Sequence, residues 1–117
     1  MSQRTKGLEG EALAAVFLEQ QGYRVLERNF RFERGEVDLI AEDGDELVFV
    51  EVKTRHSGQF GTPEEAMTPK KEALMKKVAE GYLHVHRIDQ QACRFDVVAI
   101  LFVGGEPRIR LIRNAFL

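Results

Sequence analysis

The stretch that decides the fold runs from Glu36 to Arg55 and is EVDLIAEDGDELVFVEVKTR. Its two apolar runs, 36–42 and 46–55, are rich in valine, leucine and isoleucine and predict extended strands. Asp43-Gly44 lies between the two runs and is a strong signal for a two-residue turn. We therefore expect an antiparallel hairpin in this part of the chain.

The charged residues of this hairpin gather on one face, because alternate residues of a strand point to the same side. Glu36 and Asp38 share a face of the first strand, and Glu51 and Lys53 share a face of the second. The predicted turn pairs Glu36 with Glu51 and Asp38 with Phe49, so Asp38 and Glu51 become diagonal neighbours. The opposite face is apolar and consists of Val37, Leu39, Val48, Val50 and Val52.

Carboxylates crowded onto one face of an apolar hairpin are costly unless a positive charge neutralises them. A divalent cation would do so, and Mg²⁺ typically takes one or two carboxylates together with water and phosphate oxygens. Lys53 lies on the same face, where its ammonium would orient water or stabilise negative charge on a phosphate. Asp38, Glu51, Lys53 and a metal ion together predict metal-assisted hydrolysis of phosphodiester bonds.

Other interpretations of these residues stay open. Glu-x-Lys is common on solvated strands, so Glu51 and Lys53 alone carry little weight. Asp38 carries more, because aspartate is depleted in strands and its neighbours here are apolar. Glu36 is a reserve ligand, since a glutamate at a strand end is more often solvated. Asp96 is either an acid behind the site or simply a hydrogen-bonded strand residue, and the second interpretation is preferred.

The rest of the chain predicts two helices and further strands. The second helix begins at Thr62-Pro63 or at Thr68-Pro69, since both pairs have the form of an N-cap followed by proline. The apolar stripe expected on that helix is Leu74, Val78, Tyr82 and Val85. The other elements are a helix over 6–21 and strands over 23–32, 94–103 and 108–112. The order is αβββαβ(β), which predicts an α/β fold with a mixed sheet flanked by helices.

Two further sets of charged residues lie outside the hairpin. Glu11 lies among apolar residues of the first helix, and a carboxylate on a buried face indicates a ligand for metal or metal-bound water. Glu9 is the weaker alternative, because the helix dipole favours acids in the first turn anyway. Basic residues after the hairpin are interpreted either as phosphate contacts or as a solvated helix face: Arg55, Lys70, Lys71 and Lys77.

Length and composition set outer limits. The 117 residues suit one domain, taken as 1–117, and the net charge of −2 argues against nucleic-acid binding over the whole surface while allowing a local basic face. No apolar run approaches the roughly 20 residues that span a bilayer. No apolar leader follows Met1, and the single cysteine, Cys93, is expected to be buried. We expect a cytoplasmic protein with no membrane partner.

Short motifs spread along residues 7–103 form a recognisable set. They are Gly7-x-x-Gly10-Glu11, Gly35-Glu36-Val37-Asp38-Leu39-Ile40-Ala41, Phe49-Val50-Glu51-Val52-Lys53-x-Arg55, Phe60-Gly61-x-Pro63 and Arg94-Phe95-Asp96-Val97. With these motifs the chain resembles the bacterial YraN-like family. That family is assigned by similarity to the restriction-endonuclease-like PD-(D/E)xK superfamily, close to archaeal Holliday-junction resolvases.

The resemblance implies a site and an activity. The acidic pair and lysine of the superfamily fall on Asp38, Glu51 and Lys53, its first-helix acid falls on Glu11, and the backbone carbonyl of Val52 would be a metal ligand. The implied activity is a Mg²⁺- or Mn²⁺-dependent endonuclease acting on DNA, including structured or branched DNA, and resolvase relatives imply a homodimer. The alternative is a non-catalytic nucleic-acid-binding or adaptor protein that retains the fold.

Overall fold

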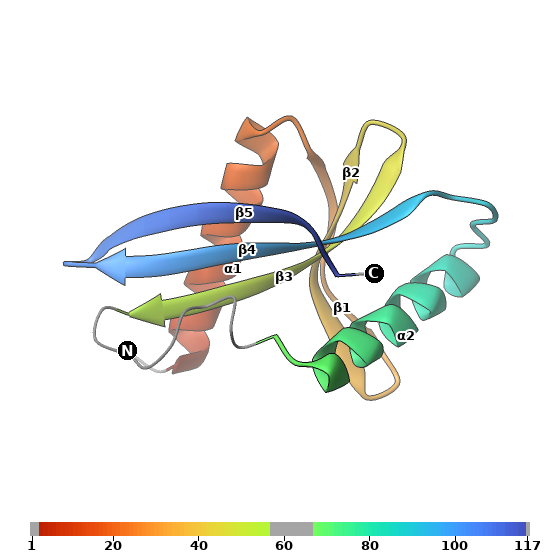
Figure 1. Ribbon diagram of the computed structural model, residues 1–117, viewed down its shortest axis with the longest axis horizontal. Coiled ribbons are helices and arrows are strands. Elements are labelled where there is room, and N and C mark those ends of the chain that lie inside the picture. The colour runs from red at the N-terminus through yellow and green to blue at the C-terminus, as the bar shows by residue number, and fades with distance from the viewer. Residues whose placement is uncertain (1–2, 57–66, 117) are drawn as a thin grey trace.

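The computed structural model describes residues 3–56 and 67–116, with side chains from Glu9 onward. This part of the chain forms two helices and five strands (Figure 1). The elements in chain order are α1 Gln3–Gln20, β1 Arg24–Phe32, β2 Gly35–Asp43, β3 Glu46–His56, α2 Pro69–Val85, β4 Cys93–Val103 and β5 Glu106–Phe116. The predicted order is confirmed, and the last strand is twice as long as expected.

The strands form one mixed sheet in the order β1-β2-β3-β4-β5. Among the described strands, only the central strand β3 and its neighbour β4 pair in parallel, because α2 carries the chain back across the sheet between them. The other three pairs are antiparallel. A mixed sheet flanked by two helices is compatible with the nuclease-like fold that the sequence predicts. No helix in the described residues is long and apolar enough to cross a membrane.

Each helix covers a different face of the sheet, with α1 behind the sheet and α2 in front of it in Figure 1. Ala14, Ala15 and Leu18 of α1 pack on the inner strands in one core. Met75, Val78 and Tyr82 of α2 pack on the other face in a second core. A charged side chain in either core is buried, and it therefore needs a hydrogen-bonding or oppositely charged partner.

The hairpin turn is Gly44-Asp45, so the predicted Asp43-Gly44 turn is wrong. Asp43 pairs with Glu46 as the last rung of the β2–β3 ladder. Both residues are held there by Arg94, whose guanidinium donates to Asp43 Oδ2 at 2.8 Å and to Glu46 Oε1 at 2.9 Å. The register therefore moves by two residues, which preserves side-chain parity but brings Asp38 to the level of Glu51 instead of Phe49.

Strand β2 also departs from strict alternation near Asp38. The β2–β3 ladder ends at the Leu39–Val50 pair, while β2 stays paired with β1 as far as Gly35. Leu39 packs in the core against α1, but Val37 packs in the core against α2 and not beside Leu39 as predicted. The reason is local: the N–H of Val52 binds the side chain of Asp38 and not the backbone of β2.

Helix α2 begins at the second of the two predicted starts. Thr68 is its N-cap, with Oγ1 accepting from the backbone N–H of Lys71 at 3.2 Å, and Pro69 follows. The Thr62-Pro63 alternative lies outside the described residues. Half of the predicted apolar stripe is wrong, since Leu74 and Val85 are 40% and 56% exposed. The helix is rotated so that Met75, Val78, Ala79 and Tyr82 face the sheet.

Candidate metal site

Three carboxylates from two elements converge at the point where β2 leaves β3. Glu11 lies on α1, and Glu36 and Asp38 lie on β2, with one carboxylate oxygen of each within 4.8 Å of the others. All three side chains are half-buried. Glu36, considered only a reserve ligand from the sequence, is a full member of the group. Oxygen donors at this spacing suit a divalent cation of the Mg²⁺ type.

Asp38 occupies the most enclosed position of the group. Its Oδ2 accepts the N–H of Val52 at 2.7 Å. Burial raises the pKa of Asp38 to about 8, and the nearby charges of Glu51 and Glu11 add to the effect, while the Val52 hydrogen bond opposes it. The described residues therefore leave Asp38 with a deficit of positive charge, which either a proton or a cation would supply.

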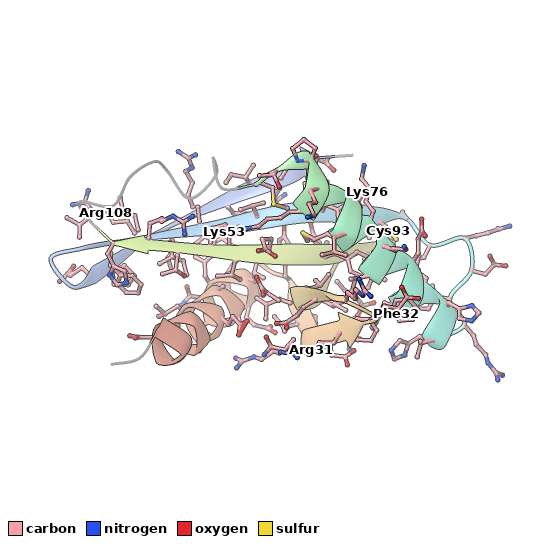
Figure 2. The ribbon with its side chains drawn as sticks, turned by 90° about the horizontal axis from the view of Figure 1, so that it is seen from below. Arg31, Phe32, Lys53, Lys76, Cys93 and Arg108 are labelled. Atoms are coloured by element: carbon pink, nitrogen blue, oxygen red, sulfur yellow. The ribbon has the colours of Figure 1, made fainter. Side chains whose placement is uncertain are left out.

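Glu51 and Lys53 face the α2 side of the same region. Lys53 Nζ lies 2.9 Å from Glu51 Oε1, and Lys53 is only 8% exposed along β3 (Figure 2). Burial lowers the pKa of Lys53, but hydrogen bonds with Lys71 and Glu51 outweigh it, so the net shift is upward. The pKa of Lys71 is lowered, first by its contact with Lys53 and then by burial. Lys53 is therefore held as an ammonium next to the carboxylates.

Asn29 of β1 completes the site, although the sequence assigned it no role there and Asn29-x-Arg31 only belongs to the motifs of the family resemblance. Its carboxamide is oriented with the NH₂ toward the acids, because the opposite orientation places oxygen against oxygen. It then donates to Glu36 Oε1 at 3.0 Å and to Glu11 Oε1 at 2.7 Å. Asn29 has a φ of +54°, a conformation that asparagine tolerates better than most residues. An asparagine within a predicted strand was the available signal.

The predicted phosphate contacts divide into two sets. Lys71 reaches the site beside Lys53, and Arg55 follows Lys53 on β3, where its Nη1 donates to the carbonyl of Thr54 at 2.9 Å. Lys70 and Lys77 are exposed on α2, and neither is part of the carboxylate group. Val52 contributes its N–H to the site, and ligation by its carbonyl stays a prediction.

Two other residues singled out in the sequence lie outside the site. Asp96 is fully buried and hydrogen-bonded by Arg94 and Tyr23, so the preferred interpretation of a hydrogen-bonded strand residue is supported. Cys93 is exposed, and the expectation that it is buried is wrong. It is the first residue of β4, where its Sγ lies 3.4 Å from the carbonyl of Gln91 and not in either core.

The fold and the site define a mixed α/β protein with a carboxylate cluster and a buried lysine at the centre of its sheet. Residues 10–100 match the family described as "Uncharacterised protein family UPF0102", and the chain belongs to this family. The proteins similar to it include a UPF0102 protein of Syntrophomonas wolfei, 50% identical over 113 residues that cover 97% of this chain and 98% of the relative. A UPF0102 protein of Moorella thermoacetica is 46% identical over 118 residues, 99% of this chain and 98% of the relative. The YraN-like family membership expected from the motifs is thereby confirmed.

Proposed function

We propose that this protein is a metal-dependent endonuclease that hydrolyses phosphodiester bonds in DNA, with structured or branched DNA among its substrates. The observation that carries the proposal is the convergence of Glu11, Glu36 and Asp38 within 4.8 Å, next to an ammonium at Lys53. The proposal places the protein in the PD-(D/E)xK superfamily, related to archaeal Holliday-junction resolvases. A homodimer and a cytoplasmic location are part of the same proposal.

The donor set fits Mg²⁺ or Mn²⁺, because it consists of hard carboxylate oxygens with a charge deficit at Asp38. Asp38 would be the central ligand, joined by Glu11 and Glu36 of the same group and by Glu51 and the Val52 carbonyl on the neighbouring strand. When bound, the metal would polarise the phosphate and lower the pKa of a water molecule. Asn29 would hold Glu11 and Glu36 in place through its two-sided hydrogen bonds.

Lys53 would act on the phosphate itself. Its ammonium is anchored by Glu51 at 2.9 Å and is almost fully buried, so it is a fixed positive charge in a poorly solvated place. Such a charge stabilises the negative charge that develops on phosphate oxygens during hydrolysis. Lys71 and Arg55 lie next to Lys53 and would contact the flanking phosphates, with Lys70 directly before Lys71 and Lys77 further along α2.

Cleavage of a DNA panel tests the proposal. Purified protein is incubated with Mn²⁺ or Mg²⁺ and with linear duplex, single-stranded, forked and four-way junction DNA. We expect cleavage of at least one substrate by the wild type and a loss of about 100-fold or more in Asp38→Asn and Lys53→Met. Asp89→Asn removes an exposed acid outside the site and is the matched control. A wild-type protein that cuts no substrate above the level of Asp38→Asn contradicts the proposal.

A second candidate is a non-catalytic nucleic-acid-binding or adaptor protein. Two observations favour this second candidate: the carboxylate of Glu51 is already paired with Lys53, and the net charge of the chain is −2. Metal titration separates the two candidates. Mn²⁺ should raise the melting temperature of the wild type more than that of Glu51→Gln if the site holds metal. Equal melting curves, together with salt-dependent DNA binding and no turnover, support the binding protein.

A further inference from the structure

A groove of about 540 Å³ lies between α2 and the turn that joins β1 to β2. Its lining residues are Phe32, Glu33, Arg34, Leu74, Lys77 and Val78. The proposed metal site uses none of these residues as a ligand. The groove is nevertheless its neighbour, because Gly35 follows the turn directly and Glu36 of the carboxylate group comes next.

The walls of the groove are fixed by two close contacts with glycine. The ring of Phe32 packs so tightly on Gly81 of α2 that a methyl group at position 81 would overlap it. Gly35 likewise contacts Val78 and Leu74, and a side chain there would push the turn away from the helix. The apolar floor is therefore preformed. Leu74, which also lines the groove, remains 40% exposed among the described residues.

The rim of the groove carries more positive than negative charge. Arg34 and Lys77 are exposed, and neither forms an ion pair within the described residues. Glu33 is the single acid of the lining. An apolar floor between two exposed cations is complementary to a nucleotide, which has a flat base with apolar faces and a negatively charged phosphate.

Helix α2 sets the separation, along its own axis, between the groove and the proposed site. Lys71 contacts Lys53, and Lys77 lies six residues further along the helix, a rise of about 9 Å at 1.5 Å per residue. A nucleic-acid strand advances about 3.4 Å per nucleotide in B-form, so the rise corresponds to about two or three nucleotides. Lys70, Leu74 and Lys77 follow one stripe of α2, along which such a strand would run.

We propose that this groove binds an unpaired nucleotide of the substrate strand, with its base on Phe32 and Leu74 and its phosphate at Arg34 and Lys77. The inference rests on the proposed function and narrows the substrate to DNA with a single-stranded segment beside the cleaved phosphate. A base within a duplex is stacked on both faces and cannot enter the groove, so a fully paired strand leaves it empty.

Binding to forked and to fully paired DNA tests the groove without relying on cleavage. Fluorescence anisotropy is measured with the whole protein in EDTA, on labelled DNAs of one sequence. The double variant Arg34→Ala/Lys77→Ala should bind forked DNA about tenfold more weakly, with a shallower salt dependence, and paired duplex nearly as well as the wild type. Lys76→Ala is the matched control, since Lys76 is the adjacent lysine and lies on the other side of α2 from Phe32 (Figure 2).

A scan with abasic nucleotides tests the base contact. One abasic site is placed at each successive position of the single-stranded arm. The wild type should lose affinity by about tenfold at one position, because a stacked base is missing there, and Leu74→Asp should be insensitive to that position. Thermal melting confirms that each variant is folded. A uniform profile along the arm, or equal binding by Lys76→Ala and the double variant, overturns the inference.

The two proposals fail in different ways. If the wild type cuts forked DNA but the double variant binds it normally, the groove is refuted and the nuclease stands. If the double variant and the abasic scan behave as expected but no DNA is cut with Mn²⁺ or Mg²⁺, the nuclease is refuted. The groove is then the nucleotide site of a binding protein.

Discussion

Asp96 and Asp38 are two strand aspartates with opposite surroundings. Both interrupt an apolar run of the sheet. Asp96 is fully buried and receives Arg94 Nε at 3.0 Å and the hydroxyl of Tyr23 at 2.8 Å. Asp38 receives one backbone N–H at 2.7 Å and lies among the carboxylates of Glu11, Glu36 and Glu51, with the ammonium of Lys53 acting on it only through its charge. Within the described residues, Asp96 is therefore paired directly with a cation, whereas Asp38 has no hydrogen bond from one.

The two aspartates also serve different ends of the β2–β3 hairpin. Arg94 binds Asp96 and both residues that flank the turn, Asp43 and Glu46, so it fastens the turn end of the hairpin to β4. At the other end, β2 separates from β3 beyond Leu39, and the carboxylate group lies in that opening. The turn end of the hairpin is held firmly by Arg94. The opposite end can therefore keep carboxylates close together, although their repulsion lowers the stability of the folded protein.

The largest effect should follow from removing Arg94. Arg94→Leu leaves Asp96 buried with no cation and also releases Asp43 and Glu46. We expect a loss of about 3–5 kcal/mol in the free energy of unfolding, measured by urea denaturation. Arg24→Leu is the matched control, because it breaks an exposed pair with Glu42 and should cost at most about 1 kcal/mol. Equal losses in the two variants would remove the contrast between the two aspartates.

Metal binding should have the second largest effect on the stability of the folded protein. This effect should depend on the carboxylate group. At a concentration of about 100 times the dissociation constant, a bound ion stabilises the folded state by about 2.7 kcal/mol. We therefore expect Mn²⁺ to raise the melting temperature of the wild type and of Arg24→Leu. It should leave that of Asp38→Asn unchanged. A rise of the same size in Asp38→Asn would place the ion elsewhere.

The pH dependence of stability gives a third test. The pKa of Asp38 is raised to about 8, whereas an unfolded aspartate titrates near 4. Between these values the folded protein keeps a proton that the unfolded chain releases, so the free energy of unfolding should fall as pH rises from about 4 to 8. Asp38→Asn should lack this fall. At pH 8 without metal it should be more stable than the wild type by at least about 1.4 kcal/mol, the equivalent of one pKa unit.

Unfolding is followed by urea titration at pH 5 and pH 8 for both proteins. Glu80→Gln, an exposed acid on α2, is the control and should follow the wild type at both values. A wild type that gains stability from pH 5 to pH 8 would contradict the charge deficit at Asp38.

The sequence was sufficient for the order of elements and for the charged face of the hairpin, because both depend on local periodicity. It was insufficient for the register, because the position of the turn depends on Arg94, which is about fifty residues away from Asp43 in the chain. It also assigned Val37 to the wrong core. That assignment assumed strict alternation, which a side chain-to-backbone bond from Val52 to Asp38 interrupts.

The composition of the site was predictable only in part. Asp38, Glu51 and Lys53 stood out because charges are rare in apolar strands. Glu36 and Asn29 did not, since a polar residue at a strand end or in an outer strand is common on protein surfaces and only tertiary packing brings these two to Glu11. A contact between α1, β1 and β2 has no short-range signal in the chain.

The smallest expected effect is at Asn29. Its neutral amide donates to Glu11 and Glu36, whereas Asp96 is bound by the charged guanidinium of Arg94. Asn29→Gly keeps the positive φ but removes the amide from Glu11 and Glu36, and we expect a loss of about 0.5–1.5 kcal/mol. Asn29→Ala should cost about 1 kcal/mol more, because alanine is strained at this φ. Saturating Mn²⁺ should reduce the Asn29→Gly deficit, since the ion takes over the neutralisation of the two acids. A deficit that metal leaves unchanged would mean that Asn29 supports β1 and not the carboxylate group.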